Sequence, residues 1–472
     1  MKRIRRSDRT CTSHPHTTTR RSFLGTTTAL ATCAASQRVS GQTVLPAVHA
    51  AGTDEIRIAL IGCGGRGAGA AADAMSVPST PVKLYAIADI FDQQIKNKRK
   101  GLTHQFKERV NVTDDRCFVG MNAYRHAIDS LRPGVDIAVF ATPPAFRATH
   151  FAYAIERGVN VFMEKPVSID GPSTKRILQL AKEADAQGLK VGVGLMCRHS
   201  VARRELFDRL QNGEAGELLS FHGYREHGPV MPMDLYPGPP SDMTELFWQC
   251  KRFHNFLWAS GGVFSDFYVH HVDEVCWMKN MWPIQAEAIG GRHFQGKIND
   301  QNFDSYGVEW TFADGTKFFY SGRTMKGCEK KFGVFGQGSK GAFTISARGH
   351  SPAKSTIYKS ASANADNILW TAQQPEKSPY RIEWEDLVAA VIDNTPYNEA
   401  VRGAEASLVT AMGRFAAHTG KSVTFDEMLA CPDDLTSGVT SLNDQSDAIV
   451  QMNEDGQYPT PMPGRFKFEY RS

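Results

Sequence analysis

An aspartate and a histidine lie four residues apart in the stretch 260–277, at Asp266 and His270. At about 100° per residue in a helix, their side chains and those of Asp273 and Trp277 fall within about 60° of one another. An apolar stripe occupies the opposite side and consists of Phe264, Tyr268, Val272 and Val275. Imidazole titrates near neutral pH, so a histidine beside a carboxylate suits acid–base chemistry. The pattern predicts a helix that packs one face and presents Asp266 and His270 from the other.

Two other interpretations of this pair remain open. An intrahelical Asp–His pair on a solvated face would only stabilise the helix, by about a few tenths of a kcal/mol. A metal site is the second alternative, because His222, His227 and His254 lie nearby in the sequence. No HExxH motif, paired cysteines or other ligand signature accompanies them, so the sequence predicts no metal.

A lysine with a possible role in catalysis follows an apolar run in the first half of the chain. Residues 159–163 predict a buried strand that delivers Glu164, Lys165 and Pro166 at its carboxyl end. An earlier run, 135–140, ends in the same way before Thr142. Ligands of open parallel sheets bind at such carboxyl ends. Lys165 could there donate to a reacting oxygen and stabilise negative charge that develops on it.

A glycine turn near the start of the chain is a candidate binding site for a cofactor. The apolar run 56–61 leads into Gly62, Gly64 and Gly67, and an alanine-rich segment follows. This GxGxxG order of strand, turn and helix is that of a dinucleotide-binding unit, with the helix N-terminus aimed at the phosphates. Gly65 and Arg66 are further candidate phosphate contacts. Alone, the motif would be weak evidence.

An acidic residue at the expected distance strengthens the motif. Residues 82–88 predict a second strand that ends at Asp89, 22 residues after Gly67. An acid at this place accepts from the ribose 2′-hydroxyl and repels a 2′-phosphate. The sequence therefore predicts NAD as the cofactor rather than NADP, and expects Asp89, Thr142 and Lys165 to line one crevice.

The elements that must position these residues divide the chain in two. Four or five successive strand–helix units over residues 55–196 predict a doubly wound α/β domain. Residues 197–472 change character and predict an α+β domain with a mainly antiparallel sheet. Its expected strands are 284–294, 303–312, 316–321, 332–335 and 341–345, and its expected late helices are 383–394 and 400–419. Residues 221–258 and 346–376 have no clear period and are expected to be loops.

At this point the chain resembles the Gfo/Idh/MocA oxidoreductases, the relatives of glucose–fructose oxidoreductase and inositol dehydrogenase. The resemblance rests on the GCGGRG turn, the ATPP strand end with His150 beyond it, and Met163-Glu164-Lys165-Pro166. A later segment, 419–429, is similar to one found in many exported members. The resemblance runs from residue 55 to about residue 430.

The resemblance implies hydride transfer between NAD(P) and a hydroxyl carbon of a sugar or polyol. Lys165, Asp266 and His270 would then be catalytic, with Glu164 beside the cofactor and His270 as the base. Asp266 would either orient His270 or hold a neighbouring hydroxyl. Arg198 is a candidate for contact with substrate or cofactor, and an equally good candidate for a surface arginine. The alternatives are an NAD-dependent glycoside hydrolase of the same fold and a non-catalytic sugar-binding relative. In this family the open face of the second sheet often forms subunit contacts, which implies a homo-oligomer.

The first fifty residues predict a leader rather than part of the fold. Arg20 and Arg21 followed by a modest apolar stretch resemble a twin-arginine signal, which implies export of a folded protein to the periplasm. The formal net charge of +4 comes from this leader, because the rest of the chain is mildly acidic. A nucleic-acid partner is therefore not expected, and the apolar stretch is too short for a transmembrane segment. Seven cysteines remain after the leader, with no CxxC pair, so no disulfide framework is predicted.

Overall fold

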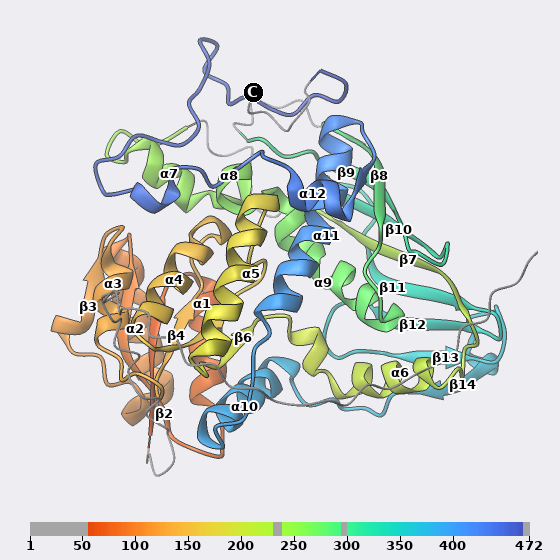
Figure 1. Ribbon diagram of the computed structural model, residues 1–472, viewed down its shortest axis with the longest axis horizontal. Coiled ribbons are helices and arrows are strands. Elements are labelled where there is room, and N and C mark those ends of the chain that lie inside the picture. Colours follow the sequence, from red (N-terminus) through yellow and green to blue (C-terminus); the bar gives the residue numbers. More distant parts are fainter. Residues whose placement is uncertain (1–54, 230–237, 294–299, 466–472) are drawn as a thin grey trace, which may run out of the picture. The chain divides into compact units, whose positions relative to one another are not determined.

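The computed structural model describes residues 55–229, 238–293 and 300–465 (Figure 1). The leader predicted for residues 1–50 lies outside the described residues. All of these described residues belong to one compact unit. Among the described helices, none combines the length and the apolar character that crossing a membrane requires.

The first half of the described chain forms a six-stranded parallel sheet in the order β3-β2-β1-β4-β5-β6. Its strands are β1 Ile56–Ile61, β2 Val82–Asp89, β3 Cys117–Val119, β4 Ile137–Phe140, β5 Asn160–Met163 and β6 Val191–Val193. Its helices are α1 Gly65–Met75, α2 Asp92–Phe106, α3 Ala123–Asp129, α4 Arg147–Glu156 and α5 Gly171–Ala186. Strands β4, β5 and β6 are buried on both faces, as continuous apolar runs require. The predicted doubly wound domain is confirmed.

The second half forms a nine-stranded sheet in the order β14-β13-β12-β11-β7-β10-β9-β8-β15. Its first strands are β7 Leu218–His227, β8 Gln285–Gly291, β9 Ser305–Thr311, β10 Lys317–Thr324 and β11 Lys331–Gly338. The others are β12 Ala342–Ala347, β13 Thr356–Tyr358, β14 Ile368–Thr371 and β15 Val423–Thr424. One neighbouring pair, β7 with β10, is parallel and the rest are antiparallel. The predicted mainly antiparallel sheet is therefore confirmed.

The expected loop over residues 221–258 is wrong at both of its ends. Residues 221–227 belong to β7, an inner strand of the large sheet, and α7 Glu245–Lys251 and α8 Leu257–Ser260 follow. The sequence of β7 is rich in polar residues because one face of this strand is open. Its place in the sheet comes from backbone pairing with β10 and β11, which leaves no signature in the side chains. The expected loop over 346–376 likewise contains β13 and β14.

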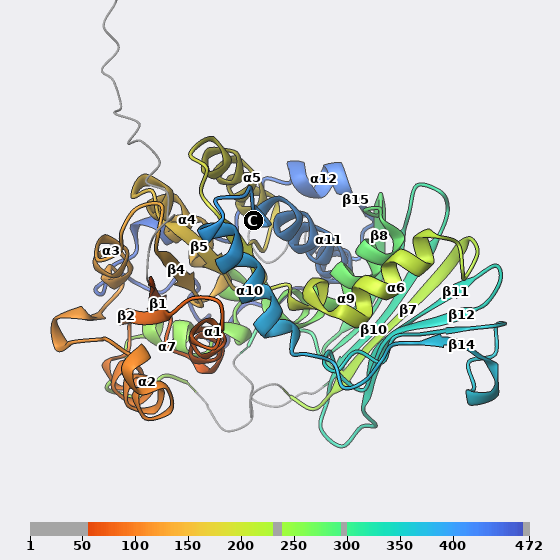
Figure 2. The same ribbon diagram turned by 90° about the horizontal axis from the view of Figure 1, so that it is seen from below.

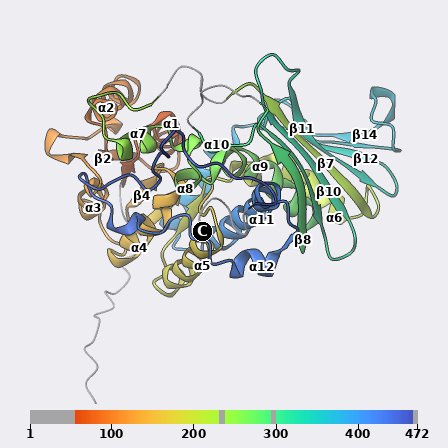
Figure 3. The same ribbon diagram turned by 90° about the horizontal axis from the view of Figure 1, so that it is seen from above.

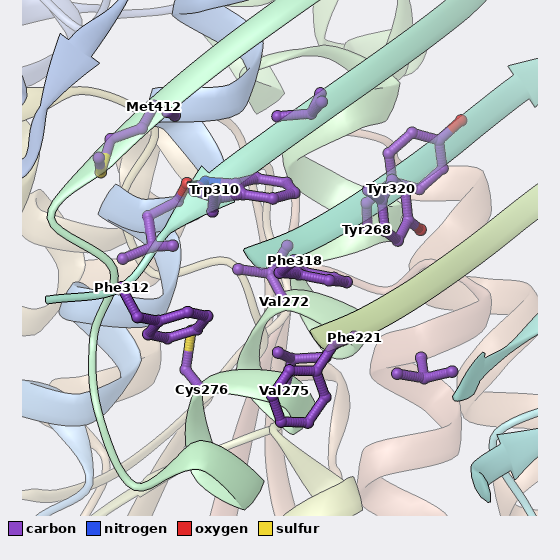
Figure 4. Packing of buried hydrophobic residues seen from close by; sticks show 14 of the residues in the cluster. Phe221, Tyr268, Val272, Val275, Cys276, Trp310, Phe312, Phe318, Tyr320 and Met412 are labelled. Carbon is purple, nitrogen blue, oxygen red and sulfur yellow. Dashed lines mark hydrogen bonds between the residues drawn. The ribbon is translucent and has the colours of Figure 1, made fainter. Parts of the chain in front are cut away.

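Helix α9, Gly262–Lys279, contains the Asp266–His270 pair and lies beneath the large sheet (Figure 2). Its predicted apolar stripe packs against Trp310, Phe318 and neighbouring sheet residues, as Figure 4 shows. The opposite side of α9 is also buried, because the chain around Lys165 covers it. Asp266 and His270 are each only 7% exposed, so the solvated-face interpretation does not hold.

Three more helices complete this half. They are α6 Val201–Gln211, α10 Pro379–Ile392 and α11 Ala400–Thr419, with the short α12 Phe425–Ala430 after them. Helix α10 returns to the parallel sheet, where Trp384 stacks on Phe162 with ring centroids 4.4 Å apart. Residues 379–392 thus cover the sheet of the predicted 55–196 domain, although the sequence assigns them to the second domain.

Candidate active site

The glycine turn between β1 and α1 has the shape that a pyrophosphate needs. Gly62 has a φ of +96°, and a Cβ there would lie 2.6 Å from the Ala141 carbonyl carbon. A Cβ on Gly67 would lie 2.0 Å from the Gly62 oxygen, so α1 can start this close to the turn only with glycine. Gly64 and Gly65 are exposed and face open space at the start of α1. Their backbone N–H groups are therefore accessible to an anion.

Asp89 lies where the ribose-binding acid is expected and also ties the turn together. Its carboxylate accepts the backbone N–H of Cys63 at 2.6 Å and that of Phe91 at 2.9 Å. Burial raises the pKa of Asp89, while these N–H donors act in the opposite direction. Each oxygen keeps a lone pair for a ribose hydroxyl.

A cavity of about 470 Å³ opens above these residues, within the usual size of a small-molecule site. Gly62, Gly64, Asp89 and Thr142 line it, which brings four of the predicted cofactor contacts together. Lys165 is not among the residues that line this cavity. Arg147 fixes the position of Thr142, because it donates to the Thr142 hydroxyl at 3.2 Å and to the Thr142 carbonyl at 2.9 Å.

The side chain of Arg66 points away from the turn and towards Glu164. Its Nε donates to Glu164 Oε1 at 2.5 Å, and Asp73 and Glu383 lie within 3.9 Å of the guanidinium. The ion pair between Arg66 and Glu164 joins α1 to the end of β5, and Glu164 is only 4% exposed there. A phosphate contact by Arg66 would compete with these carboxylates, and its backbone N–H is the freer group. The predicted cofactor role of Glu164 would accordingly act through Arg66.

Lys165 and Asp266 meet although they are 101 residues apart in the chain. Lys165 Nζ donates to the backbone carbonyl of Asp266 and, at 3.2 Å, to its Oδ1. The other carboxylate oxygen, Oδ2, lies 2.9 Å from Nε2 of His254. Lys165 and His254 together hold the pKa of Asp266 far below its usual range, despite the cost of burial. The three side chains form a row, Lys165–Asp266–His254.

His270 lies one turn further along α9 and does not take part in this row. Of the two roles expected for Asp266, orienting His270 is not supported, because its carboxylate contacts Lys165 and His254. Burial lowers the pKa of His270 well below its ordinary value, and the nearby cations Lys165 and Arg225 lower it further. His270 is therefore neutral at pH 7. A neutral imidazole can accept a proton.

The remaining candidate, Arg198, is neither at the surface nor free. Its Nε and Nη2 donate to both oxygens of Asp273 over 2.7 to 3.0 Å, and its side chain is 12% exposed. The predicted face of α9 is thus divided between two partners: Asp266 faces Lys165, and Asp273 faces Arg198. His271 packs against Tyr320, as its place off this face suggests.

One group among the described residues has the composition of a metal site, namely Cys197, Glu274 and His350. Arg203 lies 2.9 Å from Glu274 Oε1, and Arg225 contacts His350 Nε2 at 2.9 Å. An imidazole that accepts at Nε2 carries its proton on Nδ1, which is the atom that faces Cys197 and Glu274. These contacts fit a hydrogen-bonded cluster better than a divalent cation.

Two residues of the site were missed by the sequence interpretation. His254 was considered only as a metal ligand, and its helical segment lies 12 residues before Asp266 with no motif to connect them. Arg147, 1% exposed, was not considered at all. Its position three residues before His150, after the ATPP strand end, is the only available signal.

Residues 56–194 match the family described as GFO_IDH_MocA, an oxidoreductase family with an NAD-binding Rossmann fold. This part of the chain is therefore similar to the Gfo/Idh/MocA oxidoreductases. The match covers the glycine turn, Asp89, Thr142 and Lys165, but not α9. The predicted NAD-binding domain is therefore confirmed, and the open cradle above Gly64 and Gly65 fits that cofactor.

Known relatives agree with this assignment over the same region. The chain is 27% identical over 142 residues to "scyllo-inositol 2-dehydrogenase (NAD(+))" of Bacillus subtilis strain 168, which covers 30% of this chain and 34% of that protein. It spans only about a third of the length of the curated relatives it matches.

Solved structures show that the likeness of fold extends over both halves. Aldose-aldose oxidoreductase from Caulobacter crescentus matches with a TM-score of 0.60 and 15% identity, over 78% of this chain and 99% of that one. Scyllo-inositol dehydrogenase from Lactobacillus casei, solved with NAD(H) and scyllo-inositol, matches with a TM-score of 0.57 and 18% identity, over 79% and 99%. Roughly a fifth of this chain thus has no counterpart in either structure.

Proposed function

We propose that the protein is an NAD-dependent oxidoreductase that transfers hydride between the nicotinamide ring and a hydroxyl-bearing carbon of a sugar or polyol. The observation that carries this proposal is the meeting of Lys165, from the NAD-binding domain, with Asp266 on α9, beside a neutral His270. The relatives named above that act on inositols and aldoses support the choice of substrate class.

Each residue then has a distinct task. NAD, when bound, supplies the hydride acceptor or donor. Lys165, held in place by Asp266, donates a hydrogen bond to the reacting oxygen and stabilises the negative charge that develops on it. His270 takes the hydroxyl proton when the substrate is oxidised and returns it in the reverse direction.

We further propose that the nucleotide stays bound during turnover, so that one substrate is oxidised and another is reduced in alternation. The twin-arginine pattern supports this, because an exported enzyme meets no free nicotinamide pool. The alternative is a glycoside hydrolase that oxidises its sugar transiently, eliminates the aglycone and reduces the product again. The Glu164-Lys165-Pro166 sequence favours the dehydrogenase.

The open face of the large sheet supports a homo-oligomer. Ile289 on β8 is 79% exposed and Phe319 on β10 is 40% exposed, and His222 of β7 stacks on Phe319 with centroids 5.2 Å apart. Exposed apolar residues gathered on one sheet face are typical of an interface. A second copy of this chain is the partner that we propose for it.

The test compares Lys165→Ala with Lys175→Ala, which changes an exposed lysine on α5. Purified protein is denatured and the released nucleotide identified, and then turnover is assayed with free polyols, aldoses and aryl glycosides. We expect wild type and both variants to release NAD(H), and only Lys165→Ala to lose turnover. Loss of both binding and turnover, or of neither, would contradict the assigned role. Release of the aglycone from aryl glycosides would select the hydrolase.

A further inference from the structure

The nucleotide cavity has a second wall that comes from a distant part of the chain. Besides Gly62, Asp89 and Thr142, the cavity is lined by Met243, Cys250, Lys251 and Phe253. Cys250 and Lys251 end helix α7, and Phe253 follows in the next turn. A nucleotide held by the parallel sheet would thus lie between the glycine turn and the α7 region.

Residues 432–459, which we call the C-terminal strap, connect these two walls. The strap begins after α12 and contains one short helix, η8 Val439–Ser441. Figure 3 shows it crossing from α12 towards α7 and α3. Its start is fixed to α5, because Arg176 pairs with Asp434 at 3.1 Å and the Leu435 N–H donates to Asp170 at 2.7 Å.

The first connection joins Asp444 to the loop at Gly120 and Met121, which belongs to the parallel-sheet wall of the cavity. Its Oδ1 accepts the backbone N–H of Met121 at 2.7 Å, and a Cβ on Gly120 would lie 2.8 Å from its Oδ2. Gly120 has a φ of +112° and donates its N–H to the Asp89 carbonyl at 3.1 Å. Gly120 and Met121 both line the cavity. Asp444 therefore supports the loop that lies beside the predicted ribose-binding residue.

The second connection reaches α7. Gln249 is fully buried, and its Nε2 donates to the Val450 carbonyl at 2.6 Å while its Oε1 accepts the indole N–H of Trp258 at 2.7 Å. Around this bond the strap contributes Val439, Val450 and Tyr458 to a buried apolar cluster. The cluster also contains Trp248 and Cys250 of α7, Phe256 and Trp258, and Ala145 and Phe146 from the parallel-sheet side.

We propose that the C-terminal strap holds the two walls together and thereby slows release of the nucleotide. This inference rests on the proposed function, because it explains how the bound NAD(H) would be kept through many turnovers. Moving the α7 wall outward requires the Gln249–Val450 bond to break and the apolar cluster to part. Asp444 acts as a positioning residue, since it holds the 120–121 loop and does not itself line the cavity.

The experiment measures NADH dissociation from the full-length protein, by stopped-flow fluorescence after mixing with excess NAD⁺. Asp444→Ala removes a charge-assisted bond at an exposed position, so we expect dissociation to be about tenfold faster or more. Asp444→Asn keeps an acceptor and should lie between the two. Asp447→Ala changes an exposed carboxylate of the same strap and should leave the rate unchanged.

The outcomes separate this proposal from the one on which it rests. If NADH dissociates at the same rate from Asp444→Ala and from wild type, the proposed role of the strap is wrong. The proposed function still stands in that case, because the protein binds NADH. Wild-type protein that binds no nicotinamide nucleotide overturns both. Should Asp444→Ala fail to fold, the rate in Asp444→Asn decides, and wild-type retention in that variant overturns the proposal.

Discussion

Replacement of Asp266 by asparagine tests whether the row Lys165–Asp266–His254 is the catalytic centre. Asparagine keeps the shape of the side chain and removes its charge, so the ammonium of Lys165 loses the carboxylate 3.2 Å away. Removal of one partner of a buried ion pair costs about 3–5 kcal/mol of the free energy of unfolding. Lys165 is 16% exposed and water reaches it in part, so we expect about 3 kcal/mol, the lower end of that range.

The effect on turnover follows from the same contact. Lys165 keeps its bond to the Asp266 backbone carbonyl but loses a charge-assisted bond, which is worth about 1.5–3 kcal/mol. If this bond aims Lys165 at the reacting oxygen, kcat falls by about 10- to 100-fold, while the affinity for NAD⁺ is unchanged. Urea unfolding gives the stability, and steady-state kinetics with fluorescence titration give the other two quantities.

The same helix supplies a matched control in Asp273→Asn. Asp273 is fully buried and paired with Arg198, so its replacement should cost a similar free energy of unfolding. We expect kcat at saturating substrate to be retained in this variant. Equal loss of turnover in both variants would mean that α9 is only structural at this point. Wild-type turnover in Asp266→Asn would refute the reasoning outright.

The pH dependence of the stability difference gives a further check on Asp266. Its pKa in the folded protein lies below the value of about 3.9 in the unfolded chain, so its stabilising contribution is complete above that value. The contribution is lost as the pH falls towards the folded pKa. The difference in free energy of unfolding between wild type and Asp266→Asn should therefore shrink below about pH 4. A difference that grows on acidification would contradict the assigned ion pair.

Two further predictions concern the neighbours of this centre. His254→Phe keeps a ring beside Phe267 but loses the contact with Asp266, so kcat in initial-rate assays should fall by about tenfold or more. His254→Gln should recover part of this activity. Equal activity of His254→Phe and wild type would show that His254 has no part in the mechanism. Asp89→Ser keeps an acceptor for the Cys63 N–H but removes the charge that repels a 2′-phosphate. The ratio of kcat/KM for NADP⁺ to that for NAD⁺ should rise by about tenfold or more, and an unchanged ratio would show that Asp89 does not select the cofactor.

Several features of the fold could be predicted because they depend on residues close together in the chain. The turn at Gly62–Gly67 follows from steric limits on each glycine, and Asp89 follows from the length of one strand–helix unit. The apolar stripe of α9 follows from helical periodicity. Lys165 was found in the same way, from the end of a buried strand.

Other features depend on which segments come together in space, and no local pattern reports that. Most of strand β7 was expected to be a loop, because its side chains show no strand pattern. Its neighbours β10 and β11 stabilise it through backbone hydrogen bonds, which the side chains do not reveal. Helical spacing suggested that Asp266 could orient His270, one turn away, whereas Lys165 and His254 reach its carboxylate from other parts of the chain.

The sequence by itself thus determined the parallel sheet, the mainly antiparallel character of the second sheet and the nucleotide turn, since periodicity and strand ends are local properties. It also identified most of the charged groups near that turn. Only the tertiary structure decided how these charges pair: Arg66 with Glu164, Arg198 with Asp273, and Asp266 with both Lys165 and His254. It alone also brought the C-terminal strap into contact with Met121 and with Gln249 of α7. The physical reason is that a buried charge takes its partner from whatever the fold packs against it, at any distance along the chain.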